Sequence, residues 1–377
     1  MKTTEKKTTR IYWMDNLRSI IIFLVVLYHV GGVYEAAGMW GSFWIVDDPA
    51  TISWVGIVGI AFDIFIMPAM FFIAGYLTPI SLERKGAGGF VKSKLKRLML
   101  PWLLAVLTLI PLYKVIFLYS RGLPQENWTT YFHFNNPNSQ NWLWFLPLLF
   151  VFNLLYVLLA KLNVRFDKFS IKWAVVGTFV ISVTYSMVMG NWLGFRNWTL
   201  TPLLDFENEK MLAYFMYFLV GVLAFRQNIF SELPKKKTMY TIANAVVWLP
   251  VTVHIFARIW PFFYPNPAEF EITPLYRLIW WISFHSGAIG MVYLMVESFW
   301  RYVDRSGKLW GTLSHNSYGV YIIHVIMIGI FGTLFLNANL PALVKYPLLI
   351  ISTYVGSNLL VSVYYAVKHR VRQNRNR

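Results

Sequence analysis

The chain has no cysteine and few charged residues. Its 377 residues include no Cys, and Asp, Glu, Lys and Arg together make up only 14% of them. The absence of cysteine excludes disulfides, thiolate metal sites and cysteine nucleophiles. The low charge excludes an ordinary water-soluble surface, because soluble domains carry about a quarter of their residues charged. We therefore expect lipid to be the solvent for most of this chain.

Long apolar runs take the place of the missing charges. Hydrophobic residues make up 57% of the chain, in runs of about 20 residues, which is long enough to cross a bilayer core of about 30 Å. The runs are continuous and not alternating, which indicates helices and excludes a β-barrel. We predict an all-α polytopic integral membrane protein with about ten transmembrane helices. The predicted spans are 16–36, 52–80, 98–119, 142–161, 171–190, 210–226, 238–257, 276–300, 314–336 and 343–367.

The distribution of basic residues predicts the topology. The net charge is +17, and 27 of the 34 Lys and Arg lie at the two ends or in the loops that follow even-numbered spans. By the positive-inside rule these segments face the cytoplasm, both termini included, so the charge reflects membrane topology and not nucleic-acid binding. We expect a multi-pass protein of a bacterial inner or plasma membrane. No cleavable signal peptide is expected, and 1–377 should form a single membrane domain with short cytoplasmic segments at 1–15 and 368–377.

Four titratable residues are predicted to lie well inside the helices. They are His29, Asp63, His285 and His324. Such groups cost several kcal/mol near the bilayer centre, so each is a candidate functional residue. Each also has a structural alternative, because a histidine between helices can hydrogen-bond a neighbouring carbonyl and an aspartate can be paired.

The first predicted span contains an arginine, then ten residues, then a histidine: Arg18 and His29. Further along, the chain reads FFIAGYL, KSKLKRLMLPW, NWLWFLPLLF and LSHNSYGVYIIH. Together and in this order, these segments resemble the acyltransferase-3 family of membrane acyltransferases. Two positions depart from the family pattern: Ala74 replaces a serine, and Lys94 replaces the first arginine of a basic pair. A lysine is a point charge without the bidentate fork of arginine, which weakens the expected phosphate contact there.

The resemblance implies transfer of an acyl group, acetyl or succinyl, from cytoplasmic acyl-CoA to a carbohydrate hydroxyl at the outer face. It implies His29 as the general base, and Asp63 is expected to tune this base. Arg18 lies on the helix face of His29, because eleven residues at about 100° each make nearly three turns. The residues expected to bind the CoA phosphates are Arg18, Lys92, Lys94, Lys96 and Arg97. Those expected to contact substrate are Trp144, His285 and His324, and no metal is expected.

The predicted outer loops are rich in aromatic residues and asparagine, which suits either a sugar acceptor or a membrane interface. The subgroup that this chain resembles implies a glucan as the acceptor. The main alternative function is a polysaccharide or small-solute transporter that uses Asp63 and His324 for proton relay. A purely structural membrane subunit is a third reading, which the cost of four buried titratable groups disfavours. The sequence leaves the oligomeric state open, a homo-oligomer included.

Overall fold

The computed structural model describes residues 11–36, 43–132, 137–164, 168–232, 237–263 and 273–375. The fold is all-α apart from one short antiparallel hairpin, β1 (Trp198–Leu200) and β2 (Asp205–Glu207), which the sequence did not predict. The helices are α1 (Tyr12–Tyr34), α2 (Ser53–Lys94), α3 (Leu100–Ser120), α4 (Phe145–Lys161), α5 (Ile171–Leu193), α6 (Met211–Arg226), α7 (Ile229–Glu232), α8 (Lys237–Val246), α9 (Trp248–Ile259), α11 (Pro274–Tyr302), α12 (Lys308–Leu336) and α13 (Ala342–Arg375). Shorter turns are η2 (Leu95–Met99), η3 (Trp128–Tyr131), η5 (Pro137–Trp144) and η7 (Trp260–Phe263).

Eight helical segments of the described chain are long and apolar enough to cross a membrane. The all-α polytopic architecture is therefore confirmed, while the count of ten spans remains a prediction. The difference from ten has two sources. The predicted spans 52–80 and 98–119 belong to one helical segment, Ser53–Ser120, and the predicted span 210–226 is α6, which has only 16 residues.

Helix α6 is short because the segment before it enters the helix bundle. Lys210, directly before α6, makes an ion pair with Asp63 of α2. Asp63 lies ten residues beyond the start of α2 at Ser53, a rise of about 15 Å. The hairpin and Lys210 therefore reach well into the bundle from that end, and non-helical backbone at membrane depth is tolerated where it lines a cavity.

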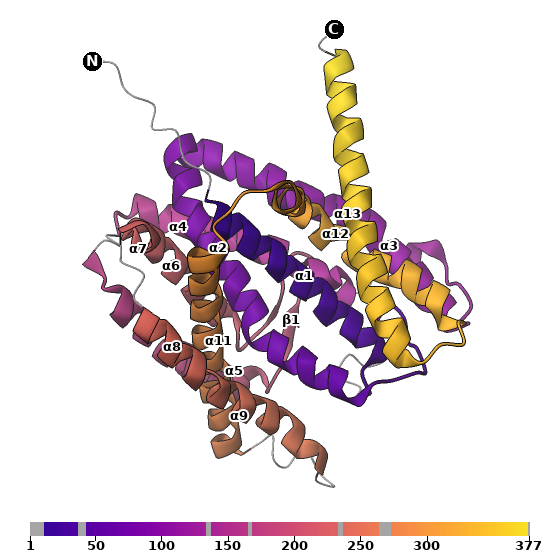
Figure 1. Cartoon of the computed structure of the whole chain (residues 1–377), viewed down its shortest axis with the longest axis horizontal. Coiled ribbons are helices and arrows are strands. Elements are labelled where there is room, and N and C mark those ends of the chain that lie inside the picture. The colour runs from indigo at the N-terminus through magenta and orange to yellow at the C-terminus, as the bar shows by residue number, and fades with distance from the viewer. Residues whose placement is uncertain are drawn as a thin grey trace.

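Helix α2 changes direction at Gly86. The backbone of Gly86 has φ of 64°, a left-handed conformation that interrupts the helix and that glycine adopts without steric cost. Figure 1 shows α2 turning here, so that its last residues run across the end of the bundle. The turn separates the membrane-spanning part of α2 from the basic stretch that continues into η2.

Two glycines allow α2 and α6 to pack with their backbones in contact. A Cβ atom on Gly75 would lie 1.9 Å from the Phe218 carbonyl oxygen, and one on Gly221 would lie 2.1 Å from the Phe72 carbonyl oxygen. Neither position has room for a side chain. Gly75 belongs to the FFIAGYL segment, so this motif owes its glycine to helix packing.

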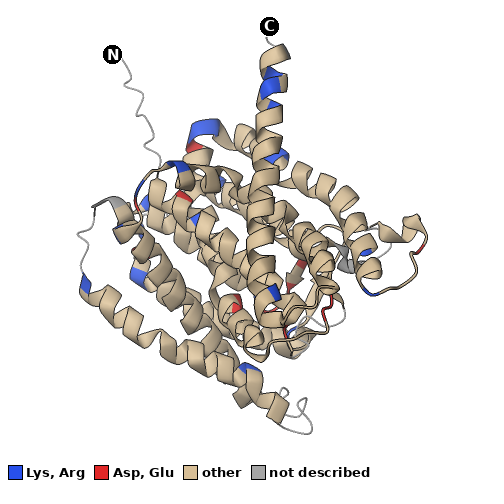
Figure 2. Ribbon diagram, turned by 45° about the vertical axis from the view of Figure 1, so that its right-hand side comes forward, with Lys and Arg blue, Asp and Glu red and all other residues tan. Residues whose placement is uncertain are grey.

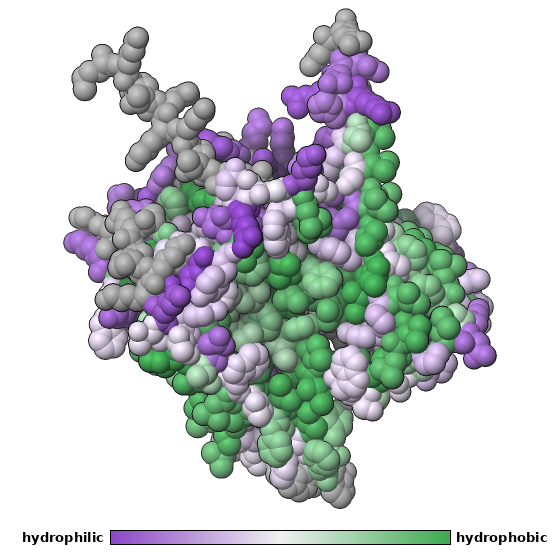
Figure 3. All heavy atoms as spheres, viewed as in Figure 1, coloured by the Kyte–Doolittle hydropathy of each residue, from purple (hydrophilic) through white to green (hydrophobic). Residues whose placement is uncertain are grey.

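The surface divides into a hydrophilic end and a hydrophobic flank. Hydrophilic residues crowd the end from which α13 protrudes, and the flank below is mainly hydrophobic (Figure 3). Lys and Arg lie along the protruding part of α13 and on nearby turns (Figure 2). The start of α1 is bound at the loop before α12, where Asp304 Oδ1 accepts from the Trp13 backbone N–H at 3.1 Å. The start of α1 and the loop before α12 thus lie together, and the side of the membrane they face remains a prediction.

Candidate active site

A cavity of about 680 Å³ lies between α1, α2, α3, α6 and α12, under the hairpin. This volume is in the range of small-molecule binding sites. Its wall combines aromatic rings with a few polar groups, among them His29, Asp63, Asn141, Asp205 and Glu207. Two of the four predicted intramembrane residues, His29 and Asp63, therefore line one cavity.

His29 of α1 and His324 of α12 form a hydrogen-bonded pair. His324 Nδ1 lies 2.7 Å from the Tyr321 carbonyl, and His29 Nδ1 lies 2.8 Å from the Val25 carbonyl. A carbonyl oxygen only accepts, so both Nδ1 atoms carry protons. His324 Nε2 lies 3.3 Å from the same His29 Nδ1, so in the neutral pair the single Nδ1 proton is shared between the Val25 carbonyl and His324 Nε2. This neutral tautomer of His29 has its basic lone pair on Nε2, as a general base requires.

The His29 ring is held by aromatic packing as well as by hydrogen bonds. Trp44 stacks on it with ring centroids 5.4 Å apart and planes 21° apart. The segment that carries Trp44 is fixed by a buried ion pair, in which Lys345 Nζ lies 3.0 Å from Asp48 Oδ2. His324 is itself fully buried behind His29. The imidazole that faces the cavity is therefore positioned from two sides.

Arg18 and His29 both contact α12, as expected for two residues on one face of α1. Its guanidinium donates to Ser317 Oγ at 3.2 Å and to the Ser314 carbonyl at 3.2 Å, both on α12. Asp15 adds an ion pair at 3.1 Å. Arg18 and His29 therefore lie along one α1–α12 interface, with Arg18 towards the hydrophilic end and about 16 Å from His29 along the helix.

The basic residues predicted to bind CoA lie near the same end of α12. Lys92 and Lys94 end α2, while Lys96 and Arg97 belong to η2. The Tyr318 hydroxyl of α12 donates to the Arg97 carbonyl, which ties η2 to the helix that also holds Arg18. The structure thus brings all the predicted phosphate-binding residues to one end of the molecule.

Asp63, which was expected to tune His29, makes its ion pair with Lys210 instead. Its carboxylate is 3.0 Å from Lys210 Nζ, and Lys210 also lies 3.0 Å from Glu207 Oε2. The partner of the His29 ring is His324. Asp63 shares the cavity wall with His29 but is held in a separate charge network.

The other two predicted substrate residues differ in position. Trp144 lines the cavity, edge-on to Trp198 at 5.7 Å and stacked on Tyr214 at 6.0 Å. His285 is fully buried on α11, where its Nε2 lies 3.0 Å from Ser186 Oγ. Ser186 donates to the Glu209 carbonyl, so His285 is the donor to Ser186 and serves helix packing. Trp144 stays a candidate contact for substrate, and the structure places His285 outside the cavity wall.

Asp205, on β2, adds a titratable group to the cavity wall. Its Oδ1 accepts from the Thr201 backbone N–H at 3.0 Å and from Gln140 Nε2 at 3.2 Å. Burial raises the pKa of the Asp205 carboxyl from 3.8 to about 7. Asp205 can therefore change charge near neutral pH beside any group bound in this part of the cavity.

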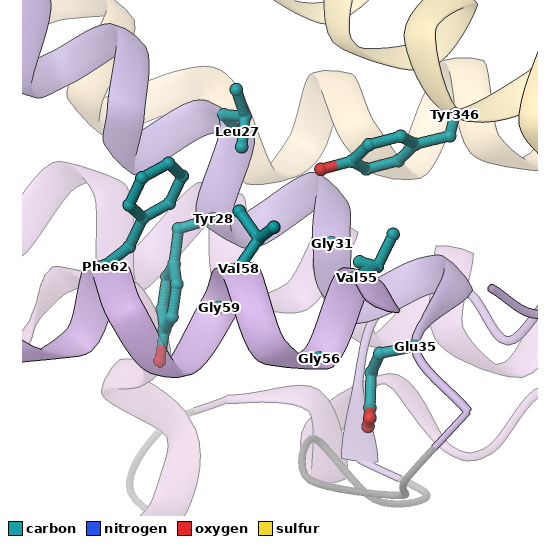
Figure 4. Close-up of a pocket in the computed structure, with 10 residues that line it drawn as sticks. All are labelled: Leu27, Tyr28, Gly31, Glu35, Val55, Gly56, Val58, Gly59, Phe62 and Tyr346. Atoms are coloured by element: carbon teal, nitrogen blue, oxygen red, sulfur yellow. The ribbon is translucent and has the colours of Figure 1, made fainter. Parts of the chain in front are cut away.

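A smaller pocket lies between α1 and α2 (Figure 4). Gly31, Gly56 and Gly59 leave the space, and Tyr346 of α13 reaches over it. Its volume is about 10 Å³, near the minimum for one water molecule. It cannot hold a substrate group, so the 680 Å³ cavity is the better candidate site.

Several residues of the site carried no clear sequence signal. Trp44, Asp205, Lys210 and Arg258 were not predicted as site residues, and neither was His254, which is buried against Trp280. One signal was present for Lys210: three charged residues, Glu207, Glu209 and Lys210, stand directly before an apolar run. Charges in that position indicate a paired group at the start of a buried helix.

Sequence comparison gives the class of protein to which this helical membrane chain and its cavity belong. The acyltransferase domain family matches residues 11–362, so the chain belongs to the acyltransferase-3 family. Among curated proteins the chain is similar to glucans biosynthesis protein C from Salmonella typhi, at 22% identity over 241 residues, and from Escherichia coli (strain K12 / DH10B), at 24% over 241 residues. Each match covers 57% of this chain and 58% of the relative. No solved structure matches this chain.

Family membership confirms two predictions from the sequence. The chain is an acyltransferase by family, and it is a multi-pass protein of a bacterial membrane. The matched relatives are named for glucan biosynthesis, and the chain spans less than two thirds of their length.

Proposed function

We propose that this chain transfers an acyl group from cytoplasmic acyl-CoA to a carbohydrate hydroxyl that enters the 680 Å³ cavity from the outer side, with His29 as general base. The observation that carries the proposal is the position of His29, which lines the cavity while the Val25 carbonyl, His324 and Trp44 hold its ring. With Nδ1 donating to the Val25 carbonyl, the neutral His29 ring has its basic lone pair on Nε2, which can take a proton.

The chemical step follows from this arrangement. The hydroxyl oxygen attacks the thioester carbonyl carbon while its proton moves to His29 Nε2. The C–S bond then breaks, and the imidazolium returns the proton to the departing CoA thiolate. His324 keeps its Nε2 as an acceptor for His29 Nδ1–H, so it holds the ring orientation throughout.

The donor is expected to approach from the basic end. Ser314 and Ser317 hold the Arg18 guanidinium, and η2 with Lys96 and Arg97 is tied to the same part of α12. Arginine and lysine are suited to phosphate groups, and the distance of about 16 Å to His29 is left for the pantetheine arm to bridge. We propose a role for Asp63 in holding Lys210 in the cavity wall, since that ion pair is its contact.

The acceptor is expected to meet the aromatic end of the cavity. Trp144, Trp198 and Tyr214 offer ring faces, and Asn141 and Asp205 offer hydrogen-bonding groups beside them. A sugar presents both apolar C–H faces and hydroxyls, so it suits such a wall. The glucan biosynthesis named in the matched relatives supports a glucan-like acceptor.

The experiment is acyl transfer by the purified full chain. The protein is incubated with acetyl-CoA or succinyl-CoA and a neutral glucan oligosaccharide, and acylated sugar is measured by mass spectrometry. CoA release is followed with a thiol reagent, which the cysteine-free chain does not consume. Equal amounts of released thiol and acylated sugar are expected. Sugar movement across vesicles without acylation would instead support the transporter alternative.

A further inference from the structure

A second cavity of about 210 Å³ adjoins the main one. It lies between α2, α9, α11 and the segment before α6. The two cavities share five wall residues: Tyr28, Phe43, Asp63, Trp198 and Glu207. A single water needs only about 10–15 Å³, so this side cavity has room for a group of several heavy atoms on a molecule bound in the main cavity.

The side cavity has a surplus of positive charge. Arg196, Lys210 and Arg258 line it, against the two carboxylates of Asp63 and Glu207. Both carboxylates are 3.0 Å from Lys210 Nζ, so they are engaged by the lysine. Among the described residues of this wall, three positive and two negative groups leave one net positive charge.

The two guanidiniums share one aromatic floor. Arg196 lies 5.5 Å and Arg258 lies 5.2 Å from the Trp280 ring centroid, within the range of cation–π contacts. Within the described residues, Arg258 makes no hydrogen bond and no ion pair. Two like charges against one ring repel each other, and an anion between them would relieve this cost. Planar guanidinium groups suit a carboxylate or phosphate because they bind its oxygens bidentately.

We propose that the side cavity binds one anionic group, a carboxylate or a phosphate, carried by a substrate in the main cavity, with Arg258 and Arg196 as its ligands. This inference rests on the proposed function for the identity of the substrate. The group has two possible sources. It is either the far end of a dicarboxylic acyl group on the donor or an acidic substituent on the acceptor, and the chemistry of recognition is the same.

The test compares matched charged and neutral substrates on the full chain. Succinyl-CoA is compared with butyryl-CoA, which lacks the terminal carboxylate, and a glucan with acidic substituents is compared with the unsubstituted glucan. Arg258→Gln should lower kcat/KM about ten- to a hundredfold for the charged member of one pair and leave its neutral counterpart within about threefold. Selective loss with succinyl-CoA assigns the group to the donor, and selective loss with the acidic glucan assigns it to the acceptor.

Arg277→Gln is the matched control. Arg277 also lies against an aromatic ring, that of Phe195 at 5.1 Å, but it is not part of the side-cavity wall. It should not change the ratio of charged to neutral turnover. Equal losses with charged and neutral substrates, or no loss in Arg258→Gln, would overturn the proposal and leave Arg258 a packing residue.

A binding measurement separates this proposal from the proposed function. Monomethyl succinate, a small monoanion, is titrated into the protein while tryptophan fluorescence is recorded, since Trp280 lies beside both arginines. Saturable binding that Arg258→Gln weakens at least tenfold supports the anion site even if no acyl transfer is found. Absence of saturable binding in the unmodified protein contradicts it.

Discussion

Replacing Gly75 by alanine should destabilise the protein through the contact between α2 and α6. The added Cβ would lie 1.9 Å from the Phe218 carbonyl oxygen, and real Cβ atoms essentially never approach closer than 3.0 Å. The helices must therefore separate by about 1 Å or more. Overpacking of this kind costs about 1–3 kcal/mol, and the clashing atom is backbone, which cannot rotate away. We expect a loss near the upper end of that range.

The same separation predicts a specific non-additive result. Gly221→Ala places its Cβ 2.1 Å from the Phe72 carbonyl oxygen across the same interface. Once one alanine has moved the helices apart, the second meets less resistance, so the double variant should lose less than the sum of the single losses. The assay is thermal unfolding in detergent.

Gly88→Ala is the control for the glycine series. A Cβ at Gly88 meets nothing within 4 Å, and its φ is not positive. This variant should be neutral or slightly stabilised. If Gly75→Ala unfolds at the same temperature as Gly88→Ala, the backbone contact between α2 and α6 is refuted.

Three further predictions concern binding, pH and topology. Arg18→Ala should weaken acyl-CoA binding about ten- to a hundredfold without unfolding the protein, because a charge-assisted phosphate contact is worth about 1.5–3 kcal/mol; unchanged affinity by calorimetry would remove Arg18 from the donor site. The pKa of Asp205 is raised from 3.8 to about 7, so the folded state binds its proton more tightly and the stability that Asp205 contributes falls as pH rises from 3.8 to about 7. Asp205→Asn should make the denaturation midpoint less dependent on pH across that window. A pH dependence equal to that of the unmodified protein would contradict the raised pKa. A single cysteine at Thr130 should react with a membrane-impermeant reagent only from outside, and labelling only from the cytoplasm would reverse the topology.

The helices were largely predictable because long apolar runs fix them locally. The predicted span 171–190 corresponds to Ile171–Leu193, and the span 276–300 to Pro274–Tyr302. The shared face of Arg18 and His29 also followed from helical geometry, and the structure shows both against α12. Local periodicity is enough for these features.

The partners within the site were not predictable in the same way. Asp63 and Lys210 are 147 residues apart, and the hairpin that brings them together has no apolar periodicity. Asp63 was expected to tune His29 because both lie at similar depth, but depth does not determine the direction in which a side chain points around the helix axis. The rotation of α2 directs Asp63 towards α6, and α12 supplies His324 instead.

The most direct test of the account is the rate of acyl-CoA-dependent sugar acylation by well-folded His29→Ala. His315→Ala is the matched control, because His315 is an exposed histidine on α12 that contacts Tyr365 and is not part of the cavity wall. General base catalysis contributes about 10²–10⁴-fold, so His29→Ala should lose turnover to that extent while it still binds acyl-CoA. Turnover within about threefold of the unmodified protein would contradict His29 as the base.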